Sequence, residues 1–463
     1  MLDTPSRARE RDLAELVDRL PDRSVLTDVR KRGTYRQDRL HDPRAGLPRA
    51  VVCATCTRDV QEVMRWASAH QVAVVPRGAG SGLSGGATAI AGGLVLSLEQ
   101  MRRIDVDPEA HTAVAQPGAL NAEVKSAASE HGLWYPPDPA SFEFCSIGGN
   151  AATNAGGLCC VKYGVTTDYV LGMEVVLADG TAVRLGGPRS KDVAGLSLTK
   201  LFVGSEGTLG VITELTLRLL PPPPTPATVI ASFGSIEEAA GAVRAITRRL
   251  RPSTLELMDH TVIRAVESWK PTGSASTAQA LLIAQSDAPG PYAGLEVESM
   301  AGACRRHGAV ELHTTSDPDE GERFCAARRM AIPALERTGR TVLVEDAGVP
   351  LPALAALFRG VSDIEALVGI TIAMVAHAGD GNTHPLIVYD AADPGQSTQA
   401  EVAFDEIMKL TIALGGTITG EHGVGRRKAA WLPTYLGTEA MALNTRIKTA
   451  LDPKGILNPG AVF

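Results

Sequence analysis

The stretch Pro76-Arg-Gly-Ala-Gly-Ser-Gly-Leu-Ser-Gly-Gly86 is the densest glycine segment in this chain of 463 residues. It lies between two apolar segments, 72–76 and 94–98, that predict β-strands. Residues 80–85 formally fit the GxGxxG pattern, but residues 87–93 are a poor helix start, which disfavours a Rossmann dinucleotide site. Successive N–H groups in a Gly/Ser loop can still form an anion-binding nest, and missing β-carbons let a pyrophosphate approach closely.

Two further stretches are rich in small residues. One predicts a loop at 146–157, whose Asn150 and Asn154 can hydrogen-bond a ring or a ribose. The other is 202–213, which leads into a strand that stops at Pro221. Any one of these loops alone is more often an ordinary turn. Three of them before one boundary favour a flat, phosphate-bearing cofactor.

The domain boundary is predicted at the proline run Pro221–Pro224, because such a run is stiff and cannot continue a sheet interior. Before it, 50–54 reads as a strand and 58–70 as a helix; beyond it, strand-like and helix-like segments alternate, as in helices laid on one face of a small sheet. We expect an α+β fold in four parts. These are an N-terminal helical segment packing on the next domain (1–49, with the stripe Leu13, Leu16, Val17, Leu20), a cofactor domain (50–220), a substrate or cap domain (227–409) and a C-terminal segment returning to the cofactor domain (410–463).

Composition excludes several classes. A net charge of −7 disfavours a nucleic-acid binder. No apolar run approaches the roughly 18 residues of a membrane helix, and the acidic N-terminus is neither a signal nor a transit peptide. Seven cysteines without a secretion signal favour a reduced, cytoplasmic setting with buried thiols.

A histidine pair flanks Asp380-Gly381, a dipeptide typical of two-residue hairpin turns. Such a turn would place His377 directly opposite His384 on one face, with β-carbons about 5 Å apart. Pro385 cannot donate a ladder hydrogen bond, so we expect the hairpin to be short or to have an edge there. Glu421, set among glycines, is a candidate third ligand, since two His and one carboxylate suit a catalytic divalent ion. A lone His would more often be a hydrogen-bonded turn residue, whereas the pair together with Glu421-His422 favours the metal.

Several motifs, in order, resemble those of an FAD-linked oxidase of the vanillyl-alcohol oxidase superfamily. Within it the chain resembles the glycolate oxidase FAD-binding subunit and the D-lactate and D-2-hydroxyglutarate dehydrogenases. The motifs are Pro76–Gly82, Pro137-Asp-Pro-Ala-Ser141, Gly148-Gly-Asn150, Gly204-Ser-Glu-Gly-Thr-Leu-Gly-Val-Ile-Thr213, His377-Ala-Gly-Asp-Gly-Asn-Thr-His384, Gly420-Glu-His-Gly-Val-Gly425 and Leu457-Asn-Pro-Gly460.

The resemblance implies a two-subdomain, PCMH-type FAD-binding domain and a cap domain. Many relatives bind FAD covalently through a His whose equivalent here is Ser81, so we expect noncovalent FAD. The implied cofactor-binding residues are Pro76, Arg77, Gly78, Ala79, Gly80, Ser81, Gly82, Ser84, Pro137, Asp138, Ser141, Ser146, Gly148, Gly149, Asn150, Ala152, Asn154, Gly157, Glu206, Gly207, Val211, Ile212 and Asn458.

The resemblance also implies the chemistry, oxidation of a small 2-hydroxy acid to the 2-oxo acid with hydride passing to flavin N5. His377, His384 and Glu421 would hold a zinc or manganese ion, His422 would take the hydroxyl proton, and Asn382 would lie beside metal and flavin. The pair Arg328-Arg329 matches the expected carboxylate clamp, and the sequence does not say which of the two serves. Val344 or Glu345 stands where the D-2-hydroxyglutarate enzymes carry a Lys, which favours glycolate or D-lactate as substrate.

Three alternatives remain open at this point. They are a D-2-hydroxyglutarate dehydrogenase, a non-redox flavin enzyme of the alkylglycerone-phosphate synthase type, and a non-catalytic electron-transfer or assembly subunit, against which Glu421-His422 argues. An electron-acceptor protein or iron–sulfur subunit is an implied partner. A homodimer is left open, and any membrane association would be peripheral, at the inner face and through partners.

Overall fold

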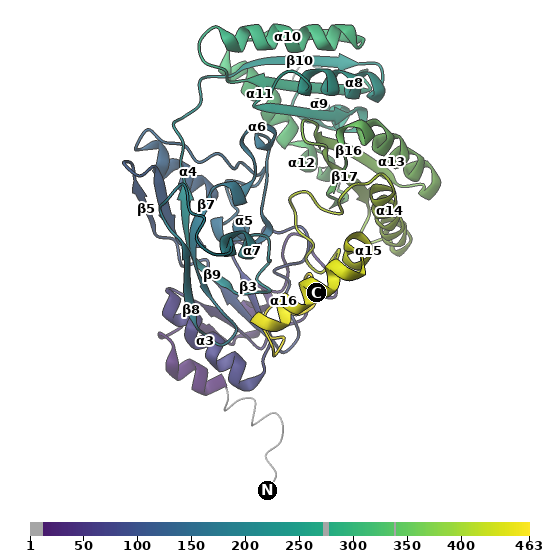
Figure 1. Cartoon of the computed structure of the whole chain (residues 1–463). Coiled ribbons are helices and arrows are strands. Elements are labelled where there is room, and N and C mark those ends of the chain that lie inside the picture. Colours follow the sequence, from purple (N-terminus) through teal and green to yellow (C-terminus); the bar gives the residue numbers. More distant parts are fainter. Residues whose placement is uncertain (1–12, 272–276, 338) are drawn as a thin grey trace. The chain divides into compact units, whose positions relative to one another are not determined.

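The computed structural model describes residues 13–271, 277–337 and 339–463. The chain forms two compact units, each of mixed helix and sheet, which confirms the predicted fold class (Figure 1). Unit 1 holds the described residues up to Ala155, then Val165–Pro222 and Glu421–Phe463. Unit 2 holds Gly156–Gly164 and Pro223–Gly420.

The first sheet of unit 1 has the order β1-β2-β4-β3, with β2, β4 and β3 parallel. The strands are β1 (Val25–Leu26), β2 (Ala50–Cys53), β3 (Val74–Arg77) and β4 (Leu94–Ser97). All four residues of β2 and of β4 are buried, as expected for parallel strands covered on both faces. Helix α3 (Thr57–His70) crosses from β2 to β3 and buries Val60, Val63, Met64 and Ala67 at helical spacing.

The N-terminal helix packs on this core only in part of the predicted stripe. Residues 13–19 are helical. Leu16 and Leu20 are buried in the core, but Val17 is 44% exposed, so the stripe is narrower than predicted.

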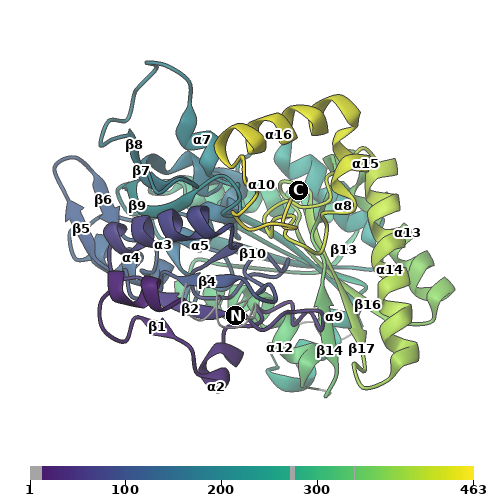
Figure 2. The same cartoon turned by 90° about the horizontal axis from the view of Figure 1, so that it is seen from below.

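The second sheet of unit 1 is antiparallel, in the order β5-β6-β9-β7-β8. Its strands are β5 (Ile104–Asp107), β6 (Thr112–Ala115), β7 (Val170–Val176), β8 (Ala182–Gly186) and β9 (Val211–Arg218). The nearby helices are α4 (Asn121–Ser129), α5 (Ile147–Thr153) and α7 (Leu198–Phe202). The C-terminal helix α16 (Thr438–Leu451) follows α15 (Leu432–Leu436) (Figure 2). Its Ile447 and Leu451 pack on the core of this sheet.

Helix α5 corrects one expectation, since the small-residue stretch predicted as a loop at 146–157 is largely helical. Ser146 caps this helix by accepting a hydrogen bond from the Gly149 N–H, and Asn154 ends it in the left-handed conformation. Ile147 and Ala151 are buried on the core side. Burial of these apolar residues outweighs the low helix propensity of the two glycines.

Unit 2 is built on one antiparallel sheet, in the order β13-β10-β12-β11-β16-β17-β14, with β15 also paired to β17. The strands are β10 (Ala227–Phe233), β11 (Thr254–Asp259), β12 (Ala280–Ser286), β13 (Ala309–Thr315), β14 (Thr341–Val344), β15 (Ala347–Gly348), β16 (Thr371–His377) and β17 (Asn382–Tyr389).

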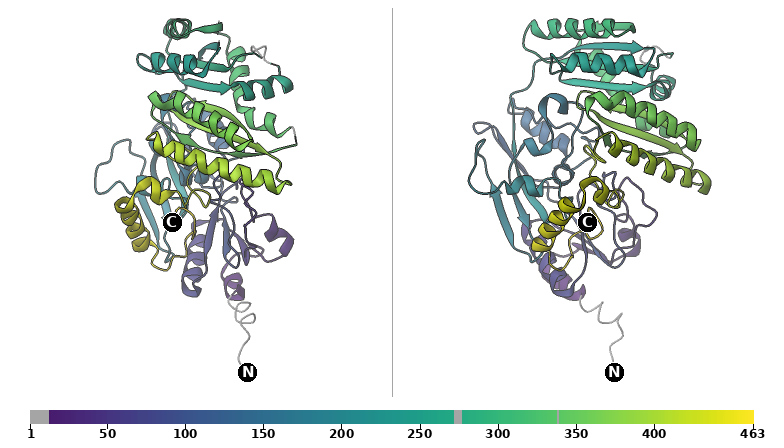
Figure 3. Two further views of the ribbon diagram at one scale, coloured as in Figure 1. Left: turned by 90° about the vertical axis from the view of Figure 1, so that its right-hand side faces the viewer. Right: turned by 45° about the vertical axis from the view of Figure 1, so that its right-hand side comes forward.

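Helices cover this sheet, with α13 and α14 running alongside each other (Figure 3). The helices of unit 2 are α6 (Cys160–Tyr163), α8 (Ile236–Thr247), α9 (His260–Trp269), α10 (Tyr292–Arg306), α11 (Pro318–Arg329), α12 (Ala331–Glu336), α13 (Leu354–Val368) and α14 (Pro394–Ala413). Successive residues of β12 reach different helices: Ser286 bonds Glu296 of α10, whereas Gln285 lies beside Gly321 of α11. Helix α11 therefore lies on the sheet face opposite to α10, so the prediction that the helices of this domain lie on one face of its sheet is wrong.

Candidate functional site

The three glycine-rich stretches of unit 1 meet at the end of β3. Gly78 lies against Ser146, because a β-carbon at Gly78 would be 2.2 Å from the Ser146 hydroxyl. Gly207 lies against Pro76, where a β-carbon would meet the proline ring at 3.0 Å. The Glu206 N–H donates to the carbonyl of Ala152 at 2.9 Å. Segments far apart in sequence thus form one small-residue surface.

The loop after β3 contacts the side chains of Arg77 and Asp38, whereas several of its own backbone N–H groups make no hydrogen bond to the described protein. The Arg77 guanidinium lies beneath Gly80, where a β-carbon would be 2.0 Å from Nη2, and Asp38 accepts from the N–H of Ala87 at 3.3 Å. Burial lowers the pKa of Arg77 and raises that of Asp38. The backbone N–H groups of residues 80–83 donate to no acceptor within the described part of the chain. Such a row of amides fits the pyrophosphate of a dinucleotide.

Several residues predicted to touch the cofactor are bonded to protein groups. Asn150 accepts from the Asn121 amide at 3.0 Å, and Asn154 accepts from the Thr167 N–H at 2.9 Å. The Asn458 amide donates to the carbonyls of Gly86 and Glu206, both at 2.8 Å. Asn458 thus joins two of the glycine-rich stretches, whereas Asn150 and Asn154 bind other residues of unit 1.

The remaining predicted positions differ in setting. Val211 and Ile212 are buried, each in a different hydrophobic core of unit 1. Pro137 accepts from the Asn121 amide at 3.3 Å, and Ser141 accepts from the Cys145 N–H at 2.9 Å. Gly157 belongs to unit 2.

The histidine hairpin in unit 2 has a different register from the predicted one. His377 pairs with Asn382 and His384 with Val375, so a four-residue loop, 378–381, replaces the two-residue turn. The two histidines are diagonal neighbours on one face and not direct opposites. Their ring centroids are 5.1 Å apart and their planes nearly perpendicular, at 85°. The predicted proximity is therefore present with the wrong pairing behind it.

Pro385 lies inside a strand that has neighbours on both sides, so the expectation of a short hairpin or an edge there is wrong. Strand β17 is paired on both sides, but its neighbour breaks around Pro385: β14 ends at Val344 and β15 resumes at Ala347. Glu345 and Asp346 occupy the break, and the Glu345 N–H donates to the Pro385 carbonyl at 2.8 Å. Pro385 has no N–H to donate to the neighbouring strand, and Glu345 and Asp346 lie where the regular pairing of that strand is interrupted.

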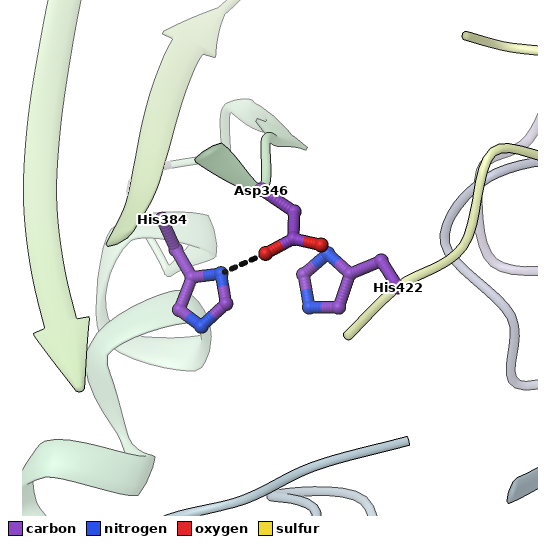
Figure 4. Close-up of side chains that lie close together, drawn as sticks. All are labelled: Asp346, His384 and His422. Atoms are coloured by element: carbon purple, nitrogen blue, oxygen red, sulfur yellow. Dashed lines mark ion pairs between the residues drawn. The ribbon is translucent and has the colours of Figure 1, made fainter. Parts of the chain in front are cut away.

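Both histidines have Nδ1 directed at an oxygen acceptor. His377 Nδ1 is 2.7 Å from a carboxylate oxygen of Glu256 on β11. His384 Nδ1 is 3.3 Å from the Glu345 carbonyl and 3.7 Å from the Asp346 carboxylate, the ion pair drawn in Figure 4. Oxygen acceptors at these positions favour a proton on each Nδ1, which leaves the Nε2 of a neutral ring with the lone pair. Metal-binding histidines commonly donate their other ring N–H to a carboxylate or a backbone carbonyl in this way.

The adjacent arginines have different surroundings. The Arg328 side chain is 6% exposed, and its Nε is 2.8 Å from the other oxygen of Glu256. Its Nη2 has no hydrogen-bond partner among the residues that the structure describes. Arg329 instead pairs with Glu322, whose side chain is 61% exposed. Of the two, only Arg328 is buried on the sheet face that carries His377.

Asn382 and Gly420 complete this part of unit 2. A β-carbon at Gly420 would be 2.3 Å from Asn382 Oδ1, an atom that makes no hydrogen bond within 13–271, 277–337 and 339–463. The Gly420 N–H donates to Asp346 at 2.8 Å. Glu421 follows directly, so its Cα is about 3.8 Å from that of Gly420. His422, also labelled in Figure 4, is the next residue, and its Nε2 is 3.9 Å from the Glu421 carboxylate.

Three buried acids of this site, each at most 1% exposed, were not predicted as site residues: Glu256, Glu345 and Asp346. Of these, the sequence analysis named Glu345 alone, as one of two residues at the position of a missing Lys. A signal existed for Glu256, a charged residue inside the apolar strand 254–259. Asp346 could have been sought through Pro385, since the proline requires a break in a neighbouring strand.

Comparison with known proteins defines the class. Residues 48–186 match the FAD binding domain family, and residues 222–462 match the C-terminal domain of FAD linked oxidases. The chain belongs to the FAD-linked oxidases and is an FAD-linked oxidoreductase. It is 41% identical to the glycolate oxidase subunit GlcD of Bacillus subtilis, over 90% of this chain and 89% of that protein. It is 34% identical to a D-lactate dehydrogenase of Anaerostipes hadrus, over 92% of each chain.

Solved structures agree with the fold. p-Cresol methylhydroxylase matches with a TM-score of 0.84 at 18% identity, covering 99% of this chain and 97% of that one. Alkyldihydroxyacetonephosphate synthase matches with a TM-score of 0.78 at 20% identity, covering 99% and 86%. At such identities the likeness concerns the fold alone. None of the described helices combines the length and apolarity needed to span a bilayer.

Proposed function

We propose that this protein oxidises a small D-2-hydroxy acid, glycolate or D-lactate, to the 2-oxo acid, using noncovalent FAD and a divalent metal ion. The observation that carries the proposal is the buried Arg328 guanidinium beside Glu256 and His377. Its Nη2 makes no hydrogen bond within the described residues, and a buried donor without a partner is costly. The carboxylate of a 2-hydroxy acid would supply the missing acceptor.

The proposed metal ligands are His377, His384 and Glu421. The Nδ1 atoms of both histidines are engaged by acceptors, which suits coordination through Nε2. Gly420 is bonded to Asp346, and chain connectivity carries Glu421 next to it. A divalent ion held there would lower the pKa of the substrate hydroxyl, and zinc and manganese both suit this donor set.

The chain's own groups then bind the substrate and move its proton. Arg328 fixes the carboxylate and thereby orients the hydroxyl-bearing carbon. His422 takes the hydroxyl proton, while the Glu421 carboxylate beside it favours the cationic ring that results. FAD, bound on the small-residue surface of unit 1, supplies the hydride acceptor.

The buried acids favour a monocarboxylic substrate. Glu256 balances Arg328, whereas Glu345 and Asp346 would repel a second carboxylate in the space around His384. This counts against D-2-hydroxyglutarate. Among the residues that the structure describes, no feature of the site favours the non-redox alternative. We further propose that electrons leave to a separate acceptor, since the most similar relatives include a protein named as a subunit of glycolate oxidase.

The test is an anaerobic titration of the purified yellow protein, following flavin absorbance. Glycolate, D-lactate, L-lactate, D-malate and D-2-hydroxyglutarate would be compared, with and without a chelator. We expect selective bleaching by glycolate or D-lactate that is lost on chelation, and flavin released by heat denaturation. Bleaching by none of them with FAD bound would refute the proposal.

Neighbouring arginines provide a matched pair of variants. Arg328→Lys should weaken substrate binding by about 10- to 100-fold, because lysine loses bidentate contact with a carboxylate. Arg329→Lys should leave it within about twofold, since its partner is a surface glutamate. Equal effects of the two variants would remove Arg328 from the substrate site.

A further inference from the structure

Glu206 lies buried in unit 1, between Gly204 and Gly207, and both of its carboxylate oxygens accept hydrogen bonds. It is 7% exposed, and its backbone φ of 51° is unusual for a residue with a side chain. Oε1 accepts from the Val424 N–H at 2.7 Å and Oε2 from the Gly425 N–H at 2.8 Å. One side chain therefore binds two consecutive amides of the C-terminal segment.

Ser84 binds the same segment through its hydroxyl and its backbone carbonyl. The Ser84 hydroxyl is 2.9 Å from the His422 carbonyl and 2.8 Å from the Gly423 carbonyl. Its backbone carbonyl also accepts from the N–H of Arg426 at 2.9 Å. Gly423 has φ 84°, and a β-carbon there would be 2.9 Å from the Glu206 carboxyl carbon. The chain from the His422 carbonyl to Arg426 is thus fixed within unit 1.

Glu206 is itself tied in place. Asn458 donates through its amide to the Glu206 carbonyl at 2.8 Å and accepts from Arg426 at 2.7 Å. The Glu206 N–H donates to Ala152. Because the backbone of Glu206 is fixed by these bonds, its carboxylate can hold the Val424 and Gly425 amides in place.

We propose that Glu206 is a positioning residue that holds the Glu421–His422 pair in its reactive position. The proposal rests on the function suggested above for these two residues. Glu206 acts through the backbone of Val424 and Gly425. Small misplacements of a reacting group cost large factors in rate, whereas substrate binding by Arg328 is unaffected. Loss of Glu206 should therefore lower the rate of reduction without weakening substrate binding.

The matched variants are Glu206→Gln and Glu174→Gln. Glu174 is another buried glutamate of unit 1, 8% exposed, whose carboxylate accepts from the hydroxyls of Thr57 and Thr213 and touches no residue of 421–427 in the hydrogen bonds of the described chain. Anaerobic stopped-flow reduction by the preferred hydroxy acid should show a limiting rate about 10- to 100-fold lower for Glu206→Gln, with substrate Kd within about threefold and FAD retained. Glu174→Gln should reduce at the wild-type rate. Glu206→Asp, which keeps the charge on a shorter stem, serves if the glutamine variant does not fold.

A second readout does not depend on activity. Hydrogen exchange at the Val424 and Gly425 amides should be faster in Glu206→Gln than in wild type or Glu174→Gln, whatever the substrate. If wild type reduces its flavin and His422→Ala does not, a wild-type rate in Glu206→Gln overturns this inference alone. If wild type is reduced by no hydroxy acid, the proposed function fails, and unchanged exchange at these amides would then overturn the role of Glu206 as well.

Discussion

Glu256 connects the proposed metal site to the proposed substrate site, so its replacement by glutamine should damage both. One carboxylate oxygen accepts from His377 Nδ1 at 2.7 Å, and the other is 2.8 Å from Arg328 Nε. Glutamine keeps the shape, but its NH2 group would face one of these two donors. The variant therefore loses an acceptor and leaves the Arg328 charge buried without its counter-charge.

The expected cost follows from burial. Glu256 and Arg328 have side chains 1% and 6% exposed, and removing one partner of such a pair costs about 3–5 kcal/mol in unfolding free energy. The matched control is Glu322→Gln, which breaks the neighbouring Arg329 pair, where Glu322 is 61% exposed. That change should cost less than about 1 kcal/mol. Loss of the orienting acceptor should also weaken metal binding by about 10- to 100-fold.

The assays are urea unfolding and metal content after dialysis against graded chelator, for wild type and both variants. We expect the free energy of unfolding to be much lower in Glu256→Gln than in Glu322→Gln. Metal retention should fall only in the former. Were both variants within about 1 kcal/mol of wild type and equally able to retain metal, Glu256 would be neither the partner of Arg328 nor the residue that orients His377.

Two further predictions concern the cofactor surface and pH. Gly78→Ala should abolish FAD binding or displace Ser146, because its β-carbon would be 2.2 Å from the Ser146 hydroxyl. The control is Gly33→Ala, whose β-carbon would have no other atom within 4 Å. In a flavin-fluorescence titration this control should bind FAD normally. Burial raises the pKa of Asp259 to about 7 from an ordinary 3.8, so the folded chain holds this proton where the unfolded chain has lost it. Unfolding free energy should therefore fall as pH rises from about 4 to about 7, by an amount on the order of a few kcal/mol. Asp259→Asn, which still accepts from the Val262 N–H, should flatten that slope in urea midpoints measured across pH; an unchanged slope would contradict the assignment.

Buried apolar runs were the most predictable part of the fold. The strands expected at 50–54 and 94–98 are observed as Ala50–Cys53 and Leu94–Ser97, because a short apolar run bounded by turn residues has few alternatives. The glycine-rich stretch at 146–157 was less predictable, since small residues suit a turn and a tightly packed helix alike. Only contacts with Pro117, 2.4 Å from a β-carbon built on Gly148, show why helix α5 needs glycine there.

For the site, too, contacts between residues close in sequence could be predicted, whereas contacts between distant residues could not. His377 and His384 could be found because a hairpin brings near neighbours in sequence onto one face. Their pairing could not, since Asp380-Gly381 suits a two-residue turn and equally the end of a four-residue loop. Glu256 lies 121 positions before His377 in the chain, and no local pattern links them.

Pro385 shows how such a distant partner could still be inferred. A proline in a strand with two neighbours leaves one neighbour without a donor, so that neighbour must leave the ladder near it. Here the chain leaves it at Glu345 and Asp346, and Asp346 then accepts from Gly420 and lies beside His384. The break in the sheet at Glu345 and Asp346 thus brings Asp346 next to His384. It also lets Asp346 bind the N–H of Gly420, the residue before Glu421. In a strand that carries candidate ligands, a proline is therefore evidence for a polar break in the adjacent strand, and acids in a short segment between two strands are the residues to test first.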